Sequence, residues 1–323
     1  MMNLNLPILN QLFNSKNLLI AGMGGGFDIF CGLPIYFELR RLGLKAHLAN
    51  LSFSNIVFSQ AAKLQQTIRL TETLVGITAE TEELPVYFPE LYLAQYLKKE
   101  FNEAVSIWCF KKTGVVPLLN NYNQLIEHLS IDGILLIDGG VDSLARGDEA
   151  EMGTVTEDAV SIAAVSQLTQ IPLRLIGCLG MGAERDITHV HILENIASLA
   201  SLDGFLGSCS LLKQMQSYQD YEKALLYVQS RPQQEPSIIN SSIISAVQGH
   251  FGDYHQTYRT KGSKLWISPL MSIYWFFELS AIVEQHLFLS QLFATETLAD
   301  VLQEMLKVMK NRPRRIAAQI PLP

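Results

Sequence analysis

Leu18-Leu-Ile-Ala-Gly-Met-Gly-Gly-Gly-Phe-Asp28 is a short apolar run that breaks into four glycines and ends in a carboxylate. The apolar run predicts a buried strand, and the glycines predict a tight loop whose backbone takes positive φ or lies very close to another group. From Asp28 to Arg41 the apolar residues recur at helical spacing. Free N–H groups at the start of a helix favour anions, so the stretch predicts a strand, an anion-binding loop and a helix.

Strand-like and helix-like patterns alternate along the rest of the chain. Strands are predicted at 44–53, 105–110, 133–138, 173–178 and 265–270. Helices are predicted at 90–103, 118–129, 154–168, 187–200, 219–229 and 238–247, and from 272 towards the C-terminus. The acidic segment 71–83 is expected to be an irregular surface excursion. This alternation predicts a doubly wound, mostly parallel sheet with helices on both faces, which is a Rossmann-like α/β fold with additional C-terminal helices.

Length and composition favour one large domain. The chain has 323 residues, of which 48% are hydrophobic and 17% are charged, so it can bury a sizeable core. We therefore expect a single α/β domain over residues 1–323. Gly22-Met23-Gly24 and Gly180-Met181-Gly182 share the same residues, and an aspartate follows each at the same spacing. This leaves open whether the halves 15–150 and 151–290 form a pseudo-repeat or the similarity is chance.

Charge and cysteine usage exclude several classes of protein. A net charge of −7 argues against nucleic-acid binding, which needs clustered Lys and Arg. The N-terminal residues lack the pattern of a secretory signal, and the four cysteines are scattered without a C-x-x-C pair. We therefore expect a cytoplasmic protein with free thiols. Charged residues, a proline and a histidine interrupt the apolar stretch 265–293, so no membrane span is predicted there.

The glycine-rich loop departs from the known nucleotide fingerprints. Phe27 occupies the third glycine position of G-x-G-x-x-G, and no G-K-[ST] sequence follows. No acidic residue lies between Leu39 and Thr71, where a dinucleotide fold would place a ligand for the ribose. Pro34 would lie inside a helix that starts at Asp28, so this helix is expected to be kinked or to start later. These features count against a conventional dinucleotide site.

Carboxylates gather in the loops that follow the predicted strands. Asp138 ends an apolar strand and Asp142 follows it, and both are predicted as catalytic acid–base groups or as ligands of a divalent cation. The loops are expected to bind a small-molecule ligand through Gly22, Gly24, Gly25, Gly26, Asp28, Gly139, Gly140, Arg146, Glu149, Gly182, Glu184 and Asp186. The simpler interpretation is that Asp28 and Asp186 cap helices and that Asp148 and Glu149 lie on a solvated loop.

Other reactive side chains favour structural roles. His189 and His191 are two residues apart at the start of a predicted helix, which places them on different sides of it. Cys31 lies among apolar neighbours and is expected to be a small buried residue. His250 and His255 flank Asp253 in a polar turn and are weaker candidates for proton transfer. The sequence has no G-x-S-x-G elbow, so a serine hydrolase is disfavoured.

The segments Ala21-Gly-Met-Gly-Gly-Gly-Phe-Asp28 and Ile137-Asp-Gly-Gly-Val-Asp-Ser-Leu-Ala-Arg-Gly-Asp-Glu149 resemble the conserved segments of the DUF1152 family of bacterial and archaeal proteins. The chain differs from the family pattern in Phe27 and in the bulky Ile29-Phe-Cys31. The resemblance implies an α/β fold and implies no reaction.

The loops at 22–28, 138–149, 180–186 and 249–255 are expected to line a crevice at the carboxyl ends of the strands. Our leading interpretation is an enzyme that acts there on a small polar substrate, with a phosphate-bearing or nucleotide-like compound as the first candidate. A divalent cation is the candidate cofactor. Two alternatives stay open: a ligand-binding or regulatory module without turnover, and a structural protein that forms homo-oligomers through the apolar region 265–292.

Overall fold

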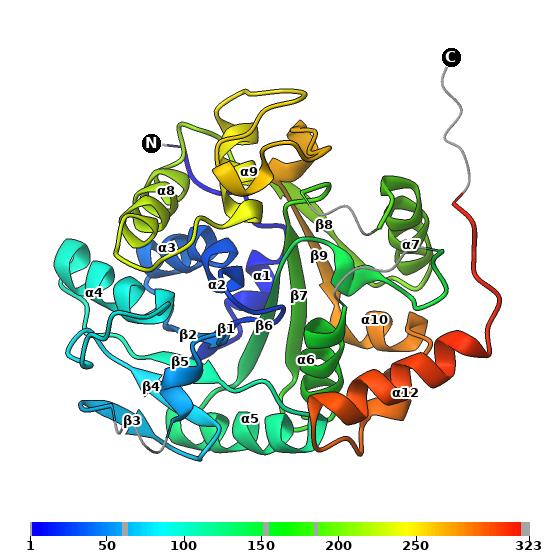
Figure 1. Ribbon diagram of the computed structural model, residues 1–323, viewed down its shortest axis with the longest axis horizontal. Coiled ribbons are helices and arrows are strands. Elements are labelled where there is room, and N and C mark those ends of the chain that lie inside the picture. Colours follow the sequence, from blue (N-terminus) through cyan, green and yellow to red (C-terminus); the bar gives the residue numbers. More distant parts are fainter. Residues whose placement is uncertain (1, 60–63, 151–154, 184–186, 318–323) are drawn as a thin grey trace.

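The computed structural model describes residues 2–59, 64–150, 155–183 and 187–317 (Figure 1). Within them, nine strands form one sheet in the order β3-β4-β5-β2-β1-β6-β7-β9-β8. In that order the strands span Thr67–Arg69, Leu74–Ile77, Ile107–Phe110, Ala46–Leu51, Leu18–Gly22, Gly133–Gly139, Leu173–Leu179, Ile273–Glu278 and Phe205–Ser210.

The five central strands are parallel and doubly wound. Their order in the sheet is β5-β2-β1-β6-β7. After β1 the chain adds β2 and β5 on one side of β1, and it then crosses to the other side of β1 to add β6 and β7. The strand order therefore reverses between β1 and β6, where Gly22 lies in register with Ile137. Such a reversal is the point at which ligands bind in open α/β sheets. Both edges of the sheet are antiparallel, with β3 and β4 on one side and β9 and β8 on the other.

Helices cover both faces of the sheet, as the sequence predicted (Figure 1). One face packs against α1 (Leu9–Leu12), α2 (Asp28–Cys31), α3 (Leu33–Arg41), α4 (Pro89–Phe101), α8 (Gln216–Gln229) and α9 (Ile238–Val247). The other packs against α5 (Val115–Leu129), α6 (Thr156–Ser166), α7 (His189–Ser201), α10 (Leu279–Gln285), α11 (Leu289–Leu292) and α12 (Leu298–Lys310). The side chains of β1 alternate between the hydrophobic cores on the two faces of the sheet. Leu19 and Ala21 pack in one core, and Leu18 and Ile20 pack in the other.

The first helix breaks where the proline predicted a disturbance. α2 ends at Cys31, and α3 begins at Leu33 with Pro34 in its first turn. Proline is tolerated there because the first N–H groups of a helix have no partner within the helix. Two short helices thus replace the continuous one over 28–41. None of the helices in the described ranges is long and apolar enough to cross a membrane.

The sequence prediction was wrong at the edges of the sheet. A strand was expected at 265–270 and helices from Ser272, but Pro269–Ser272 forms a 3-10 helix and the strand is β9, at Ile273–Glu278. Proline lacks the N–H that a ladder needs, whereas the aromatic run Tyr274-Trp-Phe-Phe277 suits a strand. The strands β4, within the supposed irregular excursion, and β8 were also missed. β8 is a partly exposed edge strand whose last four residues, at 207–210, are small, which gives a weak pattern.

Candidate functional site

Three buried aspartates meet at the point where the strand order reverses. Asp28 begins α2 after the glycine-rich loop, Asp138 lies near the end of β6, and Asp158 is in the first turn of α6. One carboxylate oxygen of each lies within 4.8 Å of an oxygen of the other two. Their residues are only 8%, 1% and 2% exposed, respectively. Three acids on separate elements are therefore held together away from bulk water.

Glycines allow the three aspartate carboxylates to lie this close to one another and to the backbone. The N–H of Gly24 donates to Oδ2 of Asp28 at 2.7 Å, and the amides of Gly25 and Gly139 act on the same carboxylate. A Cβ on Gly24 would lie 2.5 Å from that oxygen and 3.0 Å from Oδ1 of Asp158. A Cβ on Gly139 would lie 2.8 Å from Oδ1 of Asp28. The N–H groups of the glycine-rich loop therefore donate to a carboxylate of the protein itself, that of Asp28.

A short turn after β6 orients the second aspartate. The backbone N–H of Ser143 donates to Oδ2 of Asp138 at 3.1 Å, and the Ser143 hydroxyl donates to the same oxygen. Ser143 belongs to the 3-10 helix Asp142–Leu144, which also places Asp142 near Asp28. The turn therefore fixes Asp138 and adds a fourth carboxylate to the site.

Burial changes the titration of two of these acids. Desolvation raises the pKa of Asp28 to about 7, with the charge of Asp142 adding to it and the glycine amides opposing it. Desolvation also raises the pKa of Asp138 to about 7, here with a contribution from the charge of Asp28. Neighbouring buried carboxylates resist ionising together unless a proton or a cation neutralises part of their charge.

Two adjoining cavities open at the aspartates. The first, of about 190 Å³, is lined by Gly24, Gly25, Asp28, Phe53, Asp138, Gly139, Asp142, Asp158 and Ile239. The second, of about 350 Å³, shares four of these residues and adds Gly26, Phe27, Tyr87, Glu235, Ser237, Ile238, Asn240 and Arg259. It lies at the start of α9, where the Ser237 hydroxyl caps the helix by accepting from the Asn240 N–H. The acid cluster thus faces a pocket that carries an arginine.

Some of the predicted ligand-binding residues lie in these cavities and others do not. Gly24, Gly25, Gly26, Asp28, Asp138, Gly139 and Asp142 line one or both. Gly22 does not, because it packs so tightly that a Cβ would lie 2.5 Å from both Asn50 Oδ1 and the Ile29 nitrogen. Gly140 lies close to Gly180, since a Cβ on Gly180 would be 3.7 Å from the Gly140 nitrogen. The second Gly-Met-Gly loop is therefore a neighbour of the loop after β6.

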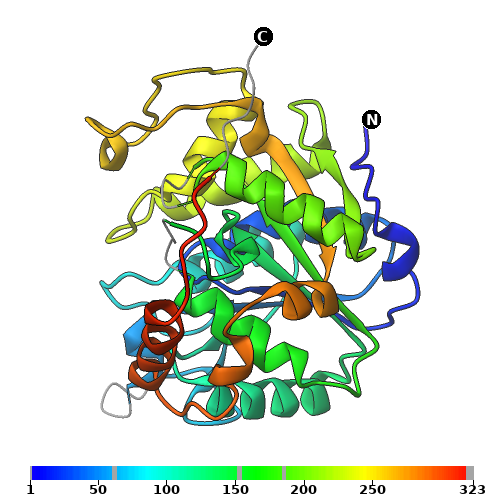
Figure 2. The same cartoon turned by 90° about the vertical axis from the view of Figure 1, so that its right-hand side faces the viewer.

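Arg146 and Glu149 lie in a separate network. The N–H groups of Arg146 and Gly147 donate to the Glu149 carboxylate, which also accepts from Asn195 and from Arg315. Arg315 comes from the C-terminal segment after α12, which runs up past α6 and α7 (Figure 2). It also pairs with Asp148 at 3.2 Å. These contacts anchor the end of the loop rather than extend the acid cluster.

The remaining candidates lie elsewhere or outside the described residues. Gly182 packs on His189, since a Cβ there would lie 2.5 Å from Nε2 of the ring. Glu184 and Asp186 fall outside the described residues. The turn at 249–255 belongs to a segment that projects from the body of the molecule (Figure 2), and none of its residues lines either cavity. His255 there contacts Asp253 at 2.8 Å.

Sequence reasoning missed several residues of the site, among them Asp158, Phe53 and Arg259. Asp158 lies beside Glu157 at the start of a helix, where acidic residues commonly complement the helix dipole. Its sequence position therefore gives no sign of a role in a site. Phe53 follows β2, is 41% exposed as a residue, and lines both cavities. Arg259 lies in the 3-10 helix Tyr258–Thr260, and no local pattern in the sequence marks it.

A family profile described as "Protein of unknown function (DUF1152)" matches residues 19–310, from β1 to the end of α12. No curated protein and no solved structure matches the chain significantly. The matched region contains the three aspartates, both cavities and all of the sheet except Leu18, the first residue of β1. The chain therefore belongs to the DUF1152 family of proteins of unknown function.

Proposed function

We propose that the protein is an enzyme that holds a divalent cation with Asp28, Asp138 and Asp158 and acts on a small phosphate-bearing substrate in the adjoining pocket. The observation that carries the proposal is the convergence of three buried carboxylates at the reversal of strand order, beside a pocket of about 350 Å³. The fold alone would not carry it, because doubly wound sheets host many unrelated functions.

The case for a cation is electrostatic. Each buried carboxylate loses hydration, and its neighbours add repulsion, so the ionised cluster needs a compensating positive charge. Oxygens within 4.8 Å of one another can contact one ion, and hard carboxylate oxygens suit Mg²⁺ or Mn²⁺. Mg²⁺ commonly completes its shell with water and substrate phosphate, which matches a cluster that opens to a pocket.

The second cavity supports a phosphate-bearing substrate. Arg259 contributes a guanidinium, which pairs with phosphate through two parallel hydrogen bonds. The pocket also receives the start of α9, where the helix dipole favours an anion. Phe53 and Tyr87 offer aromatic surface for an apolar or nucleobase-like part of the substrate.

Asp142 is the candidate general base of this arrangement. It lines the cavity of the cluster without belonging to the three closest acids. The Asp142 carboxylate would accept a proton from the attacking water and direct the water oxygen towards a phosphorus atom, and Arg259 would orient the substrate. A cation held by Asp28, Asp138 and Asp158 would supply compensating positive charge beside the phosphate.

A binding module without turnover is the second candidate. Burial raises the pKa of Asp28 and of Asp138 to about 7, so the cluster can persist with protons in place of a cation. Such a module would bind the same class of ligand and release it unchanged.

Calorimetric titration with Mn²⁺ and Mg²⁺ tests the cation site. The wild-type protein should bind one ion, and Asp158→Asn should weaken this affinity at least tenfold. Asp203→Asn is the matched control, because Asp203 is exposed in the turn before β8. Equal affinity in the wild type and Asp158→Asn, or no binding by either, would remove the cation from the proposal.

Release of inorganic phosphate from nucleotides and sugar phosphates, with Mg²⁺ or with a chelator, tests turnover. We expect cation-dependent release that Asp142→Asn slows by about 10² or more while cation affinity is retained, in line with loss of a general base. Saturable binding of such compounds without release would favour the binding module. Neither binding nor release across the panel would contradict both candidates.

A further inference from the structure

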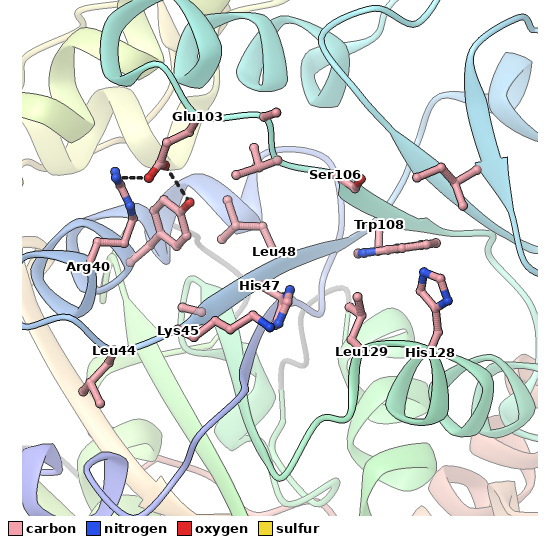
Figure 3. A pocket seen from close by; sticks show the side chains of 15 residues that line it. Arg40, Leu44, Lys45, His47, Leu48, Glu103, Ser106, Trp108, His128 and Leu129 are labelled. Atoms are coloured by element: carbon pink, nitrogen blue, oxygen red, sulfur yellow. Dashed lines mark hydrogen bonds and ion pairs between the residues drawn. The ribbon is translucent and has the colours of Figure 1, made fainter.

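A third cavity lies at the end of the sheet opposite to the aspartates. It has a volume of about 390 Å³, within the range of small-molecule pockets (Figure 3). The start of β2, the start of β5 and the ends of α3 and α5 form its walls. Because parallel strands begin at this edge and end at the acid cluster, the two sites are separated by the length of β2.

The charged side chains leave one cation without an acidic partner among the residues that line the cavity. Arg40 forms an ion pair with Glu103, which also accepts from the Tyr36 hydroxyl at 3.1 Å. Glu103 is the one acid in the cavity wall, so this pair is internally neutral. Lys45 supplies the remaining formal charge, and its side chain extends towards the ring of His47 (Figure 3).

His47 adds a polar group with unused hydrogen-bonding capacity. It occupies the second position of β2, and its Nε2 makes no hydrogen bond within the described residues. Desolvation, with a contribution from the charge of Lys45, lowers the pKa of His47 to about 4. The ring is therefore neutral near pH 7, so Lys45 carries the charge and His47 offers polarity.

The rest of the wall on this side is apolar and partly aromatic. Trp108 is buried, and the ring of His128 stands against it at 5.3 Å between centroids in an edge-to-face arrangement (Figure 3). Leu129 and Ile68 extend the apolar surface from α5 and β3. A molecule placed here would contact apolar groups at one end and Lys45 at the other.

We propose that this cavity binds a small apolar or aromatic carboxylate, with its anionic group at Lys45 and His47 and its body against Trp108, Leu129 and Ile68. A single uncompensated positive charge matches a monoanion. The apolar wall supplies burial, and the two polar groups fix the orientation. The site shares no residue with the acid cluster or its pocket, so it stands independently of the proposed catalytic function.

Isothermal titration calorimetry of the full chain with 2-naphthoate tests this site, and 2-naphthamide serves as the matched neutral compound. We expect one binding site for 2-naphthoate and at least tenfold weaker binding of the amide. Lys45→Met should weaken 2-naphthoate about tenfold, as expected for loss of a charge-assisted hydrogen bond. Lys213→Met replaces another exposed lysine, outside the cavity wall, and should have no effect.

A second variant tests the apolar wall. Ile68 is 39% exposed on β3, so Ile68→Glu can be accommodated at the surface while it places a negative charge in the cavity wall. It should also weaken 2-naphthoate at least tenfold. The proposal is overturned if 2-naphthoate does not bind, if the amide binds equally well, or if both Lys45→Met and Ile68→Glu bind like the wild type.

Discussion

Asp138→Asn should progressively stabilise the metal-free protein relative to the wild type as the pH rises. Folding raises the pKa of Asp138 from its ordinary 3.8 to about 7, because the side chain is buried beside Asp28. The folded state then binds the proton more tightly than the unfolded state. The stability from this proton is fully present below about pH 3.8 and is lost as the pH rises through about 7. Asparagine carries no charge at any of these values and escapes the loss.

The magnitude follows from the width of this window. One pKa unit corresponds to about 1.4 kcal/mol, and the folded carboxyl stays protonated over about two pH units above pH 5. Between about pH 5 and pH 8, the difference in unfolding free energy should therefore shift by about 3 kcal/mol in favour of Asp138→Asn. This shift already includes the repulsion from Asp28, because the charge of Asp28 is one of the causes of the raised pKa of Asp138.

Urea unfolding in the presence of a chelator, at several pH values across this range, measures the effect. The difference in unfolding free energy between the variant and the wild type cancels the contributions of groups that titrate equally in both proteins. Asp203→Asn controls for the loss of one surface carboxylate. Mn²⁺ added near pH 8 should stabilise the wild type and leave Asp138→Asn unchanged. A stability difference that does not vary with pH would show that Asp138 titrates normally, and the electrostatic basis of the cation site would fail.

Four further substitutions separate the parts of the molecule. Arg259→Met should weaken binding of phosphate-bearing compounds about tenfold and leave Mn²⁺ affinity unchanged, as measured by calorimetry; an equal loss of both would place Arg259 at the cation instead. Gly24→Ala should reduce Mn²⁺ affinity at least tenfold because its Cβ would meet carboxylate oxygens at 2.5–3.0 Å. Gly43→Ala, at a φ of +76° with open space around it, should cost about 1 kcal/mol of stability and no affinity. Arg315→Met should lower the unfolding free energy by about 2–4 kcal/mol, since it removes a cationic partner of the fully buried Glu149 carboxylate; unchanged urea denaturation would show that the remaining donors suffice.

The centre of the fold could be predicted because its signals are local. The apolar runs of β1, β6 and β7 each lie between turn residues, and buried parallel strands need no further information to stand out. β9 and β8 could not be placed in this way. Their pairing joins residues far apart in sequence, such as Cys178 with Trp275, and this contact is invisible to any short window.

The site was predictable only where it follows a strand. Asp28 stood out because it ends the glycine-rich loop that follows an apolar run, and Asp138 because it ends an apolar run itself. The reversal of strand order brings these two strand ends together. Asp158 reaches the cluster from α6, on the opposite face of the sheet from α2. The position of Asp158 depends on how α6 packs against the sheet. The type and spacing of residues in the sequence do not reveal this packing.

The glycine-rich loop presents the opposite charge to the one that its sequence predicts. Free amides at a helix start would make an anion site, but the amides of Gly24, Gly25 and Gly139 act on the carboxylate of Asp28. The loop therefore presents negative charge to the cavity. A phosphate could approach this wall only if a cation lay between it and the aspartates, so phosphate binding beside the cluster should require the metal, whereas binding confined to Arg259 should not. Titrating inorganic phosphate with and without Mn²⁺ separates these cases, and metal-independent binding of full strength would contradict the arrangement proposed for the cation.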